Sequence, residues 1–247
     1  MKKKIEVVIQ ARMGSSRLPG KVMMNLCQKP VLWHILERVK QATWVDNIIV
    51  ATSTLEADNA IANYLKSIGV TCFRGDESNV LSRYYNAVKQ YPASAIVRIT
   101  ADCPLIDPFV IDRVISSFLD SSFEYATNVG EARNYPRGLD CEIFTCDLLE
   151  RAFHEATEDY EKEHVTPFMY WKQDSILSIV NEKEYSNMRW TLDTIEDFQL
   201  IEAIYNHFYQ STHDFYMDDI YEFVVNNPPI FKINHNVMQK QIEPKSE

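Results

Sequence analysis

The sequence predicts an α/β protein in which helices cover both faces of a mostly parallel β-sheet, in three layers. Through residues 1–120, short apolar runs alternate with amphipathic segments of helical spacing. The apolar runs are nearly continuous, as expected of strands that are buried on both faces. Turn and capping residues separate the segments, for example Gly69 and the pair Asp107-Pro108.

The first half of the chain is expected to contain strands that each lead into a helix. The predicted strands cover 5–9, 47–52, 70–73 and 95–100, and the predicted helices cover 30–42, 55–69, 79–91 and 108–120. Pro30 lies at the opening turn of the first helix, and Gly69 ends the second. Strands that alternate with helices pair in parallel through crossover connections.

The pattern is less regular after residue 120. We expect strands at 123–128 and 139–144 around the turn residues Pro136-Arg137-Gly138, then helices and strands through residue 226, and finally an extended or fraying tail at 227–247. The later helices are predicted at 146–158, 161–172, 195–209 and 217–226, and the later strands at 175–180 and 188–192. Because no linker or repeat divides the chain, residues 1–247 are predicted to form a single domain.

Composition excludes several classes of function. The 247 residues include 35 acidic and 25 basic side chains, a net charge of −10, which argues against a nucleic-acid partner or an anionic membrane. No apolar run approaches the roughly 18 residues of a membrane span. The apolar run near the start is broken by Glu6 and Gln10, which argues against a signal peptide. The five cysteines contain no CxxC pair, so reduced thiols in a cytoplasmic protein are expected.

The stretch "ARMGSSRLPGK", residues 11–21, directly follows the first predicted strand. In parallel sheets, ligands bind at the carboxyl ends of the strands. Gly14 and Ser15 are small enough for the backbone to approach phosphate oxygens, and three cations can offset the charge of a triphosphate: Arg12, Arg17 and Lys21. The loop is neither GxxxxGK[ST] nor GxGxxG, which argues against P-loop ATPases and Rossmann dehydrogenases. The alternative is a solvated surface loop.

Two aspartates are candidate metal ligands. Asp102 follows the fourth strand in "RITADCPLIDP", and Asp193 ends an apparent strand in "MRWTLDTIED". Both can reach one point above the sheet, and Mg²⁺ prefers one or two carboxylates together with phosphates and waters. The alternative is that these aspartates form turns or cap helices.

The loop at 11–21 resembles the signature loop of cytidylyltransferases that activate sugars, and further stretches agree in the same order: "FRGDESNVLSRYY", "RITADCPLIDP", "YPRGLDCEIF", "EHVTP" and "RWTLDTIEDF". The sequence is most similar to the group of spore-coat polysaccharide biosynthesis protein F, which is related to acylneuraminate and 3-deoxy-manno-octulosonate cytidylyltransferases. The resemblance implies a sheet of the nucleotide-diphospho-sugar transferase (Rossmann-like) type. It divides the chain into a nucleotide-binding half at 1–120, an acceptor-binding and dimerisation half at 121–226, and the tail.

The resemblance also implies an activity: a Mg²⁺-dependent reaction of CTP with a sugar acid, giving a CMP-sugar and pyrophosphate for cell-surface or spore-coat polysaccharide. The partners expected are these two small molecules and a second copy of the chain. It implies that Asp102 and Asp193 hold the metal, and that the catalytic residues are Arg12, Arg17, Lys21 and Asp102. The expected nucleotide-binding residues are Ala11, Arg12, Met13, Gly14, Ser15, Lys21, Thr52, Arg74 and Asp102.

The acceptor pocket is expected in the second half. Asp140 and Glu142 alternate along one predicted strand after Arg137, so their side chains point the same way, either to solvent or into a cleft. His164 lies near a helix start in "EHVTP", as a wall of the site or as a structural histidine. The expected sugar-binding residues are thus Arg137, Asp140, Glu142 and His164.

Two other functions stay open from the sequence. A glycosyltransferase of the same fold would use a nucleotide-diphospho-sugar donor, and such enzymes usually hold their metal with an Asp-x-Asp pair, where this chain has "ADCP". A non-catalytic homologue would bind nucleotide without turnover. Release of pyrophosphate from CTP distinguishes both alternatives from the cytidylyltransferase.

Overall fold

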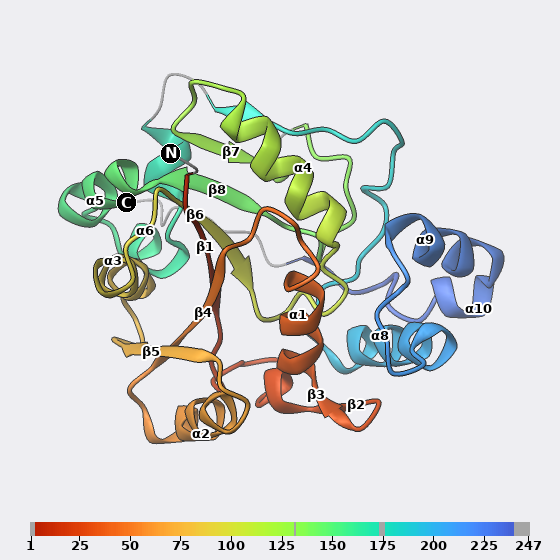
Figure 1. Ribbon diagram of the computed structural model, residues 1–247. Coiled ribbons are helices and arrows are strands. Elements are labelled where there is room, and N and C mark those ends of the chain that lie inside the picture. Colours follow the sequence, from red (N-terminus) through yellow and green to blue (C-terminus); the bar gives the residue numbers. More distant parts are fainter. Residues whose placement is uncertain (1–2, 131, 173–175, 240–247) are drawn as a thin grey trace.

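The computed structural model describes residues 3–130, 132–172 and 176–239. A seven-stranded sheet lies between two layers of helices (Figure 1). Its strands are β1 (Ile5–Gln10), β4 (Asn47–Ser53), β5 (Thr71–Gly75), β6 (Ala95–Thr100), β7 (Tyr125–Thr127), β8 (Glu142–Thr145) and β9 (Leu177–Ser178). The spatial order is β5-β4-β1-β6-β8-β7-β9, and only β8 pairs antiparallel with its neighbours. The predicted three-layer, mostly parallel fold is confirmed.

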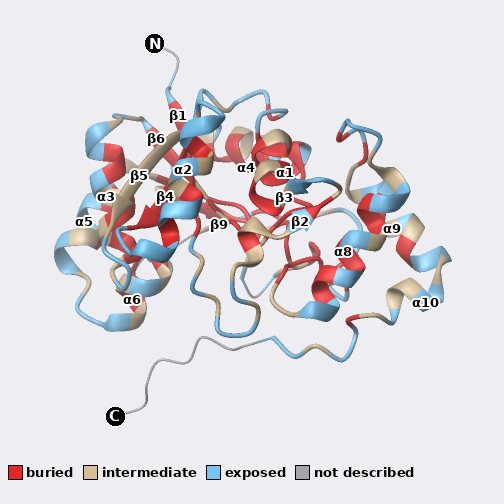
Figure 2. Cartoon of the chain, turned by 90° about the horizontal axis from the view of Figure 1, so that it is seen from below, coloured by how far each residue is buried: buried red, intermediate tan, exposed pale blue. Residues whose placement is uncertain are grey.

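Each face of the sheet has its own hydrophobic core. On β1, Val7 belongs to one core and Val8 to the other, because successive side chains of a strand point to opposite faces. Figure 2 shows the central strands of the sheet largely buried and the outer sides of the helices exposed. One core includes residues of α1 (Val31–Val39), α2 (Asn59–Ser67), α4 (Pro108–Leu119), α8 (Ile195–Phe208) and α9 (Met217–Asn226). The other face is covered by α3 (Val80–Gln90), α5 (Cys146–Glu155), α6 (Asp159–His164) and α7 (Pro167–Trp171).

The topology brings three loops to one edge of the sheet. β1 and β6 are parallel neighbours with Gln10 opposite Thr100, so the loops that follow them start side by side. β8 runs the other way, and its first residue, Glu142, pairs with Arg98 of β6. The turn that precedes β8 therefore lies at the same edge as the loops that follow β1 and β6.

The strand predicted at 188–192 is wrong. This segment is irregular and forms only an isolated bridge between Arg137 and Arg189. Its backbone is bonded to loops on both sides: the Trp190 N–H donates to the Arg137 carbonyl (2.6 Å), and the Leu192 N–H donates to the Asp102 carbonyl (2.7 Å). Asp193 therefore follows an irregular segment that hydrogen bonds hold on both sides, and it does not end a strand.

The single helix predicted at 161–172 is also wrong, because the chain forms two short helices there. Val165 takes a positive φ of 71° at the end of α6, and Pro167 opens α7. The helix predicted at 146–158 ends at Glu155, and a capping box starts α6. The strand predicted at 175–180 is reduced to β9, and residue 175 lies outside the described residues.

Several short elements were not anticipated. A hairpin of β2 (Asn25–Leu26) and β3 (Lys29–Pro30) turns through Cys27 and Gln28, whose φ angles of 45° and 68° are left-handed. The sequence lacks the Asn-Gly or Asp-Gly signal that usually marks such a turn. The other short elements are η1 (Lys21–Met23), η2 (Glu56–Asp58) and α10 (Pro228–Phe231). α10 lies in the predicted tail, of which residues 240–247 are outside the described part.

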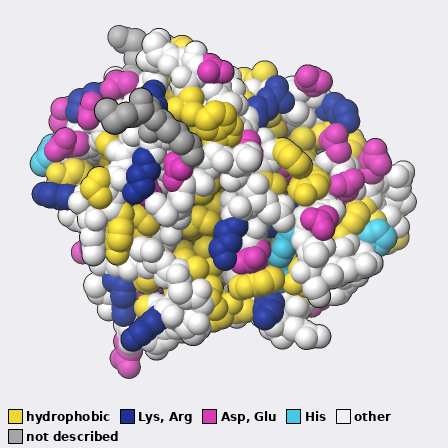
Figure 3. All heavy atoms as spheres, viewed as in Figure 1, with side chains coloured by type: hydrophobic (Ala, Val, Ile, Leu, Met, Phe, Trp, Pro, Cys, Tyr) yellow, Lys and Arg dark blue, Asp and Glu magenta, His cyan; other side chains and the backbone are white. Residues whose placement is uncertain are grey.

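The surface agrees with the acidic composition. On the face drawn in Figure 3, basic side chains are scattered among acidic and hydrophobic ones. Within the described ranges, no helix has the length and apolar character needed to cross a membrane.

Candidate active site

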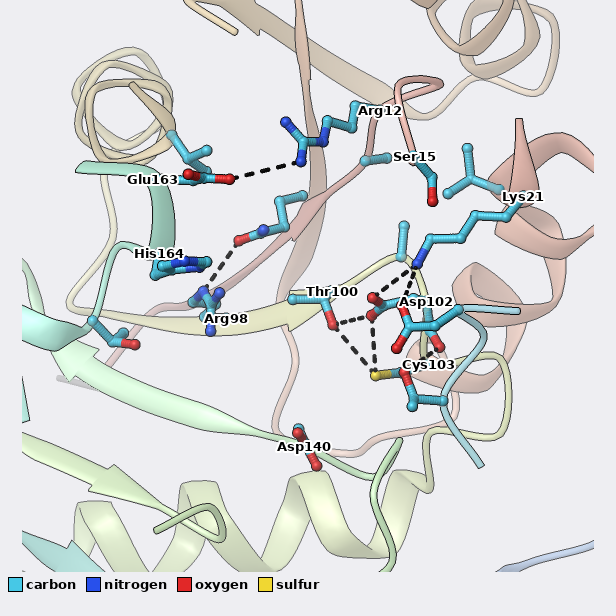
Figure 4. A pocket seen from close by; sticks show the side chains of 18 of the residues that line it. Arg12, Ser15, Lys21, Arg98, Thr100, Asp102, Cys103, Asp140, Glu163 and His164 are labelled. Carbon is cyan, nitrogen blue, oxygen red and sulfur yellow. Dashed lines mark hydrogen bonds and ion pairs between the residues drawn. The ribbon is translucent and has the colours of Figure 1, made fainter. Parts of the chain in front are cut away.

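A cavity of about 470 Å³ opens at the edge of the sheet where the three loops meet. Its walls come from the loop after β1, the end of β6, the turn before β8, the end of α6 and the segment near residue 193 (Figure 4). Most of the predicted site residues line this cavity: Ala11, Arg12, Ser15, Arg17, Lys21, Asp102, Arg137, Asp140, Glu142, His164 and Asp193.

The loop at 11–21 is held in a compact shape by backbone bonds. The Met13 carbonyl accepts hydrogen bonds from the N–H groups of Ser15 and Gly20, both at 2.9 Å. The Met13 N–H donates to the carboxylate of Asp58 (2.7 Å), a buried residue that sequence reasoning missed. Burial raises the pKa of Asp58, but hydrogen bonds from Ser53 and Met13 outweigh it, so the net pKa is lowered. The carboxylate thus stays charged and anchors the loop.

Lys21 lies at the centre of the site, between the two predicted metal ligands. Its Nζ is 3.1 Å from Asp102 Oδ2, 2.9 Å from Asp193 Oδ1 and 2.6 Å from the Leu192 carbonyl oxygen. Burial by itself lowers the pKa of Lys21, but the two carboxylates outweigh it, so the net pKa is raised. The side chain is therefore a protonated ammonium group that joins the cationic loop to both acids (Figure 4).

Asp102 is positioned by the end of β6. The Thr100 hydroxyl donates to Asp102 Oδ1, and the Asp102 carbonyl accepts hydrogen bonds from Leu192 and Thr191. These bonds hold the segment of Asp193 against the end of β6. Burial raises the pKa of Asp102, but Lys21 and Thr100 outweigh it, so the net pKa is lowered.

Asp193 is fixed from its other side by cations. Its Oδ2 lies 2.9 Å from Arg17 and 3.0 Å from Arg189. Arg189 also pairs with the fully buried Asp197 (2.9 Å), which accepts hydrogen bonds from the N–H of Asp193 and from Asn234. Sequence reasoning missed Arg189 and Asn234.

The predicted sugar-binding acids are already paired. Asp140 accepts two hydrogen bonds from Arg133, at 2.7 and 2.9 Å. Glu142 forms an ion pair with Arg98 and accepts a hydrogen bond from the Tyr125 hydroxyl. Arg98 was missed, although an arginine inside an apolar strand, "AIVRIT", requires a buried partner.

Arg137 differs from its neighbours. Its side chain is half-buried in the cavity wall and makes no hydrogen bond or ion pair with the described residues. Burial and the nearby Arg133 lower the pKa of Arg137. The guanidinium is accordingly available to an anionic ligand.

Four predicted nucleotide-binding residues are not in the cavity lining: Met13, Gly14, Thr52 and Arg74. Arg74 donates to the carbonyls of Ser53 and Leu55, both at 2.9 Å, and thereby supports the connection between β4 and α2. Thr52 is fully buried within β4. Arg83 of α3 lines the cavity instead, and its buried Nε and Nη1 atoms have no hydrogen-bond partner among the described residues.

The donor atoms around Lys21 indicate which metal the site can hold. Two carboxylates and a main-chain carbonyl are hard oxygen ligands, which suit Mg²⁺ better than softer metals. In the described part of the chain, no group of three or more His, Cys, Asp or Glu side chains forms a closed metal site. Mg²⁺ fits such an open pair, because it usually takes one or two carboxylates and completes its shell with phosphates and waters.

A cation-rich loop and a carboxylate pair lie at the carboxyl edge of the mostly parallel sheet, an arrangement that suits a nucleotidyltransferase, and the family match shows this class. The chain belongs to the cytidylyltransferase family, which it matches over residues 6–224.

Individual proteins of related name are also similar to this chain. Spore coat polysaccharide biosynthesis protein SpsF of Bacillus subtilis is 34% identical over 209 residues, covering 80% of this chain and 85% of the relative. A 3-deoxy-manno-octulosonate cytidylyltransferase of Trichlorobacter lovleyi is 35% identical over 117 residues, 47% of this chain and 45% of the relative. The solved structure of a cytidylyltransferase from Leptospira borgpetersenii is 34% identical and superposes with a TM-score of 0.88, covering 97% of this chain and 100% of that one.

Proposed function

We propose that this enzyme joins CTP and a sugar acid, in a Mg²⁺-dependent reaction, to give a CMP-sugar and pyrophosphate. The observation that carries the proposal is the contact of Lys21 with both Asp102 and Asp193 beside the loop at 11–21. Membership of the cytidylyltransferase family supports cytidine as the nucleoside.

In the proposed reaction, a hydroxyl of the sugar acid attacks the α-phosphorus of CTP and the bond to the β-phosphate oxygen breaks. Negative charge accumulates on the departing pyrophosphate. Arg12, Arg17 and Lys21 line the same cavity and would offset that charge. The compact loop fixes the backbone that carries these cations before the substrate arrives, which lowers the cost of orienting the triphosphate.

Asp102 and Asp193 would hold the metal through their carboxylate oxygens. When bound, Mg²⁺ neutralises charge on the phosphate oxygens and aligns them for displacement. Thr100 orients Asp102, and Arg189 orients Asp193. Both carboxylates are thereby fixed from the side that faces away from Lys21.

A sugar acid is supported as the acceptor by the state of Arg137. This guanidinium in the cavity wall pairs with no side chain among the described residues, and it fits a carboxylate, with which arginine forms paired hydrogen bonds. The names of the relatives support the same class of acceptor and a role in polysaccharide synthesis. From the family resemblance we also propose that the enzyme is a homodimer and that it is cytoplasmic. Sedimentation analysis tests the dimer.

The experiment is a screen of nucleoside triphosphates against several sugar acids, with detection of pyrophosphate and of the nucleotide-sugar. We expect pyrophosphate release to require CTP, a sugar acid and Mg²⁺ together, and to stop when the metal is chelated. Sugar transfer from a nucleotide-diphospho-sugar without pyrophosphate would contradict the proposal. Binding of CTP with no product from any sugar acid would favour a non-catalytic homologue.

A further inference from the structure

The ammonium group of Lys21 is fully coordinated by oxygen. A lysine has three N–H donors, and the three oxygens within 3.1 Å of Nζ belong to Asp102, Asp193 and the Leu192 main chain. The side chain is only 12% exposed. The ammonium group is therefore surrounded by oxygens as a bound metal cation would be, and it is not a solvated side chain open to an anion.

The same oxygens are the ligands that the proposed metal would use. A divalent ion bound to Asp102 and Asp193 would lie within a few ångströms of Lys21 Nζ, and like charges at that distance repel strongly in a partly buried site. The ammonium and the metal therefore compete for one position.

The charges around the two acids favour the ammonium when no nucleotide is present. Lys21, Arg17 and Arg189 supply three positive charges. The carboxylates that pair with them, Asp102, Asp193 and Asp197, supply three negative charges, so the cluster is already neutral. A divalent cation added to this neutral cluster creates a surplus of positive charge, which costs free energy. A triphosphate supplies the negative charge that removes the surplus and gives the displaced lysine a new partner.

We propose that Lys21 occupies the metal position in the free enzyme and is displaced to the triphosphate when the metal binds. Divalent-ion binding is then weak without nucleotide and strong with it. The inference rests on the proposed function of the site, and it adds an order to the reaction: metal and triphosphate enter together.

Lys21 has room for this exchange. It starts η1 directly after Gly20, which has a positive φ of 72°, and its long flexible side chain reaches the cavity that Arg12 and Ser15 also line. Arg17 stays paired with Asp193 through the other carboxylate oxygen, Oδ2, whereas Lys21 uses Oδ1. Displacement of Lys21 therefore leaves Asp193 anchored.

The test is a titration of the nucleotide-free protein with Mn²⁺, followed by electron paramagnetic resonance. We expect Lys21→Met to bind Mn²⁺ about tenfold or more tightly than the wild type, because the variant leaves the position open. Arg17→Gln is the matched control: it removes one positive charge from the same aspartate without vacating the position, and we expect a gain of about threefold at most. Lys40→Met, on the exposed end of α1, should change nothing.

Equal gains for Lys21→Met and Arg17→Gln would overturn the proposal, because charge alone would then explain the effect. No gain for Lys21→Met in a folded variant would overturn it as well. Pyrophosphate release by the wild type is measured separately, so a failed exchange is distinguishable from a failed function.

A second measurement uses the wild type and does not depend on any variant. Lys21 is labelled with an amine-reactive reagent and quantified by mass spectrometry. Saturating Mn²⁺ should increase the labelling of Lys21 severalfold relative to NaCl of equal ionic strength, with Lys40 as an internal reference. Unchanged labelling of Lys21 would show that the metal does not displace it.

Discussion

Asp102 and Asp193 are 91 residues apart in the chain, yet one ammonium group contacts both. Each carboxylate has a second, fixed partner on its far side, Thr100 for Asp102 and Arg189 for Asp193. Both acids are thus held by paired side chains: cations hold Asp193, and Lys21 together with the Thr100 hydroxyl holds Asp102. Arg137 is the exception among the sugar-site residues, because no described side chain pairs with it.

We expect Asp102→Asn to reduce turnover about a hundredfold or more, the scale of losing one charged partner in the transition state. Lys21→Ala should have an effect of the same size. The measurement is pyrophosphate release at saturating CTP. The control is Asp120→Asn, an exposed position at the end of α4 that should retain full turnover. A folded Asp102→Asn enzyme with unchanged turnover would remove Asp102 from the mechanism.

Arg137→Ala should raise the KM for the sugar acid about tenfold or more, since a charged hydrogen-bonding partner is lost. The KM for CTP should stay nearly unchanged, because the cations proposed to bind the phosphates lie on the loop at 11–21. Steady-state kinetics with each substrate varied in turn provide the measurement, and Arg151→Ala, an exposed residue paired with Glu124, is the control. A rise in the KM for CTP instead would place Arg137 at the nucleotide.

Among the elements, the turn before β8 and the segment at 188–193 depend on each other most closely. Gly138 has a positive φ of 101°, and a Cβ there would lie 2.5 Å from the Trp190 carbonyl carbon and 2.6 Å from the Thr191 nitrogen. Only glycine permits this approach of two backbones. The contact sets the path of the chain into Asp193, and the antiparallel direction of β8 brings the turn to the site.

We predict that Gly138→Ala destabilises the protein by about 3 kcal/mol, through the unfavourable φ and the clash with backbone atoms. Activity should fall as well, because the segment that carries Asp193 must shift. Gly69→Ala is the matched control: it has a similar positive φ of 70° but meets nothing within 4 Å, so only the strain of about 1 kcal/mol remains. Urea unfolding measures both variants. Equal losses of stability would show that the contact is unimportant.

At the scale of the whole molecule, a buried histidine pair joins the two halves of the chain. His34 of α1 donates from Nε2 to the Leu26 carbonyl (2.7 Å), and its Nδ1 therefore accepts from Nε2 of His213 at 2.9 Å. Tyr205 and Phe215 pack around the pair. Burial lowers the pKa of His34 to about 4 and that of His213 to about 3.

This pair should make the fold sensitive to acid. Both histidines have a pKa of about 6.5 when unfolded, so the unfolded chain binds more protons than the native protein as the pH falls below 6.5. Stability is then lost on acidification, by about 2 kcal/mol for each histidine at pH 5. Denaturant unfolding at pH 7 and pH 5 measures the loss. His213→Gln should lose less stability between the two pH values than the wild type, whereas His207→Gln, an exposed position, should behave like the wild type.

Much of the fold was predictable from local patterns. The strands and helices through residue 120 lie where apolar spacing, Gly69 and Asp107-Pro108 indicated, because those signals are contained in short stretches of chain. The largest errors fall at 161–172, where Val165 takes a positive φ, and at 188–192, where loops instead of strands supply the hydrogen-bond partners.

The sequence by itself determined the βα order, the cationic loop and the identity of the two acids, because each is carried by neighbouring residues. Tertiary structure alone decided that Lys21 lies between those acids and that Glu142 pairs with Arg98. It also decided that no side chain in the described part of the chain pairs with Arg137. Such pairings depend on which side chains the antiparallel strand β8 and the segment at 188–193 bring together at the edge of the sheet. No local sequence pattern encodes the distance between side chains that are far apart in the chain.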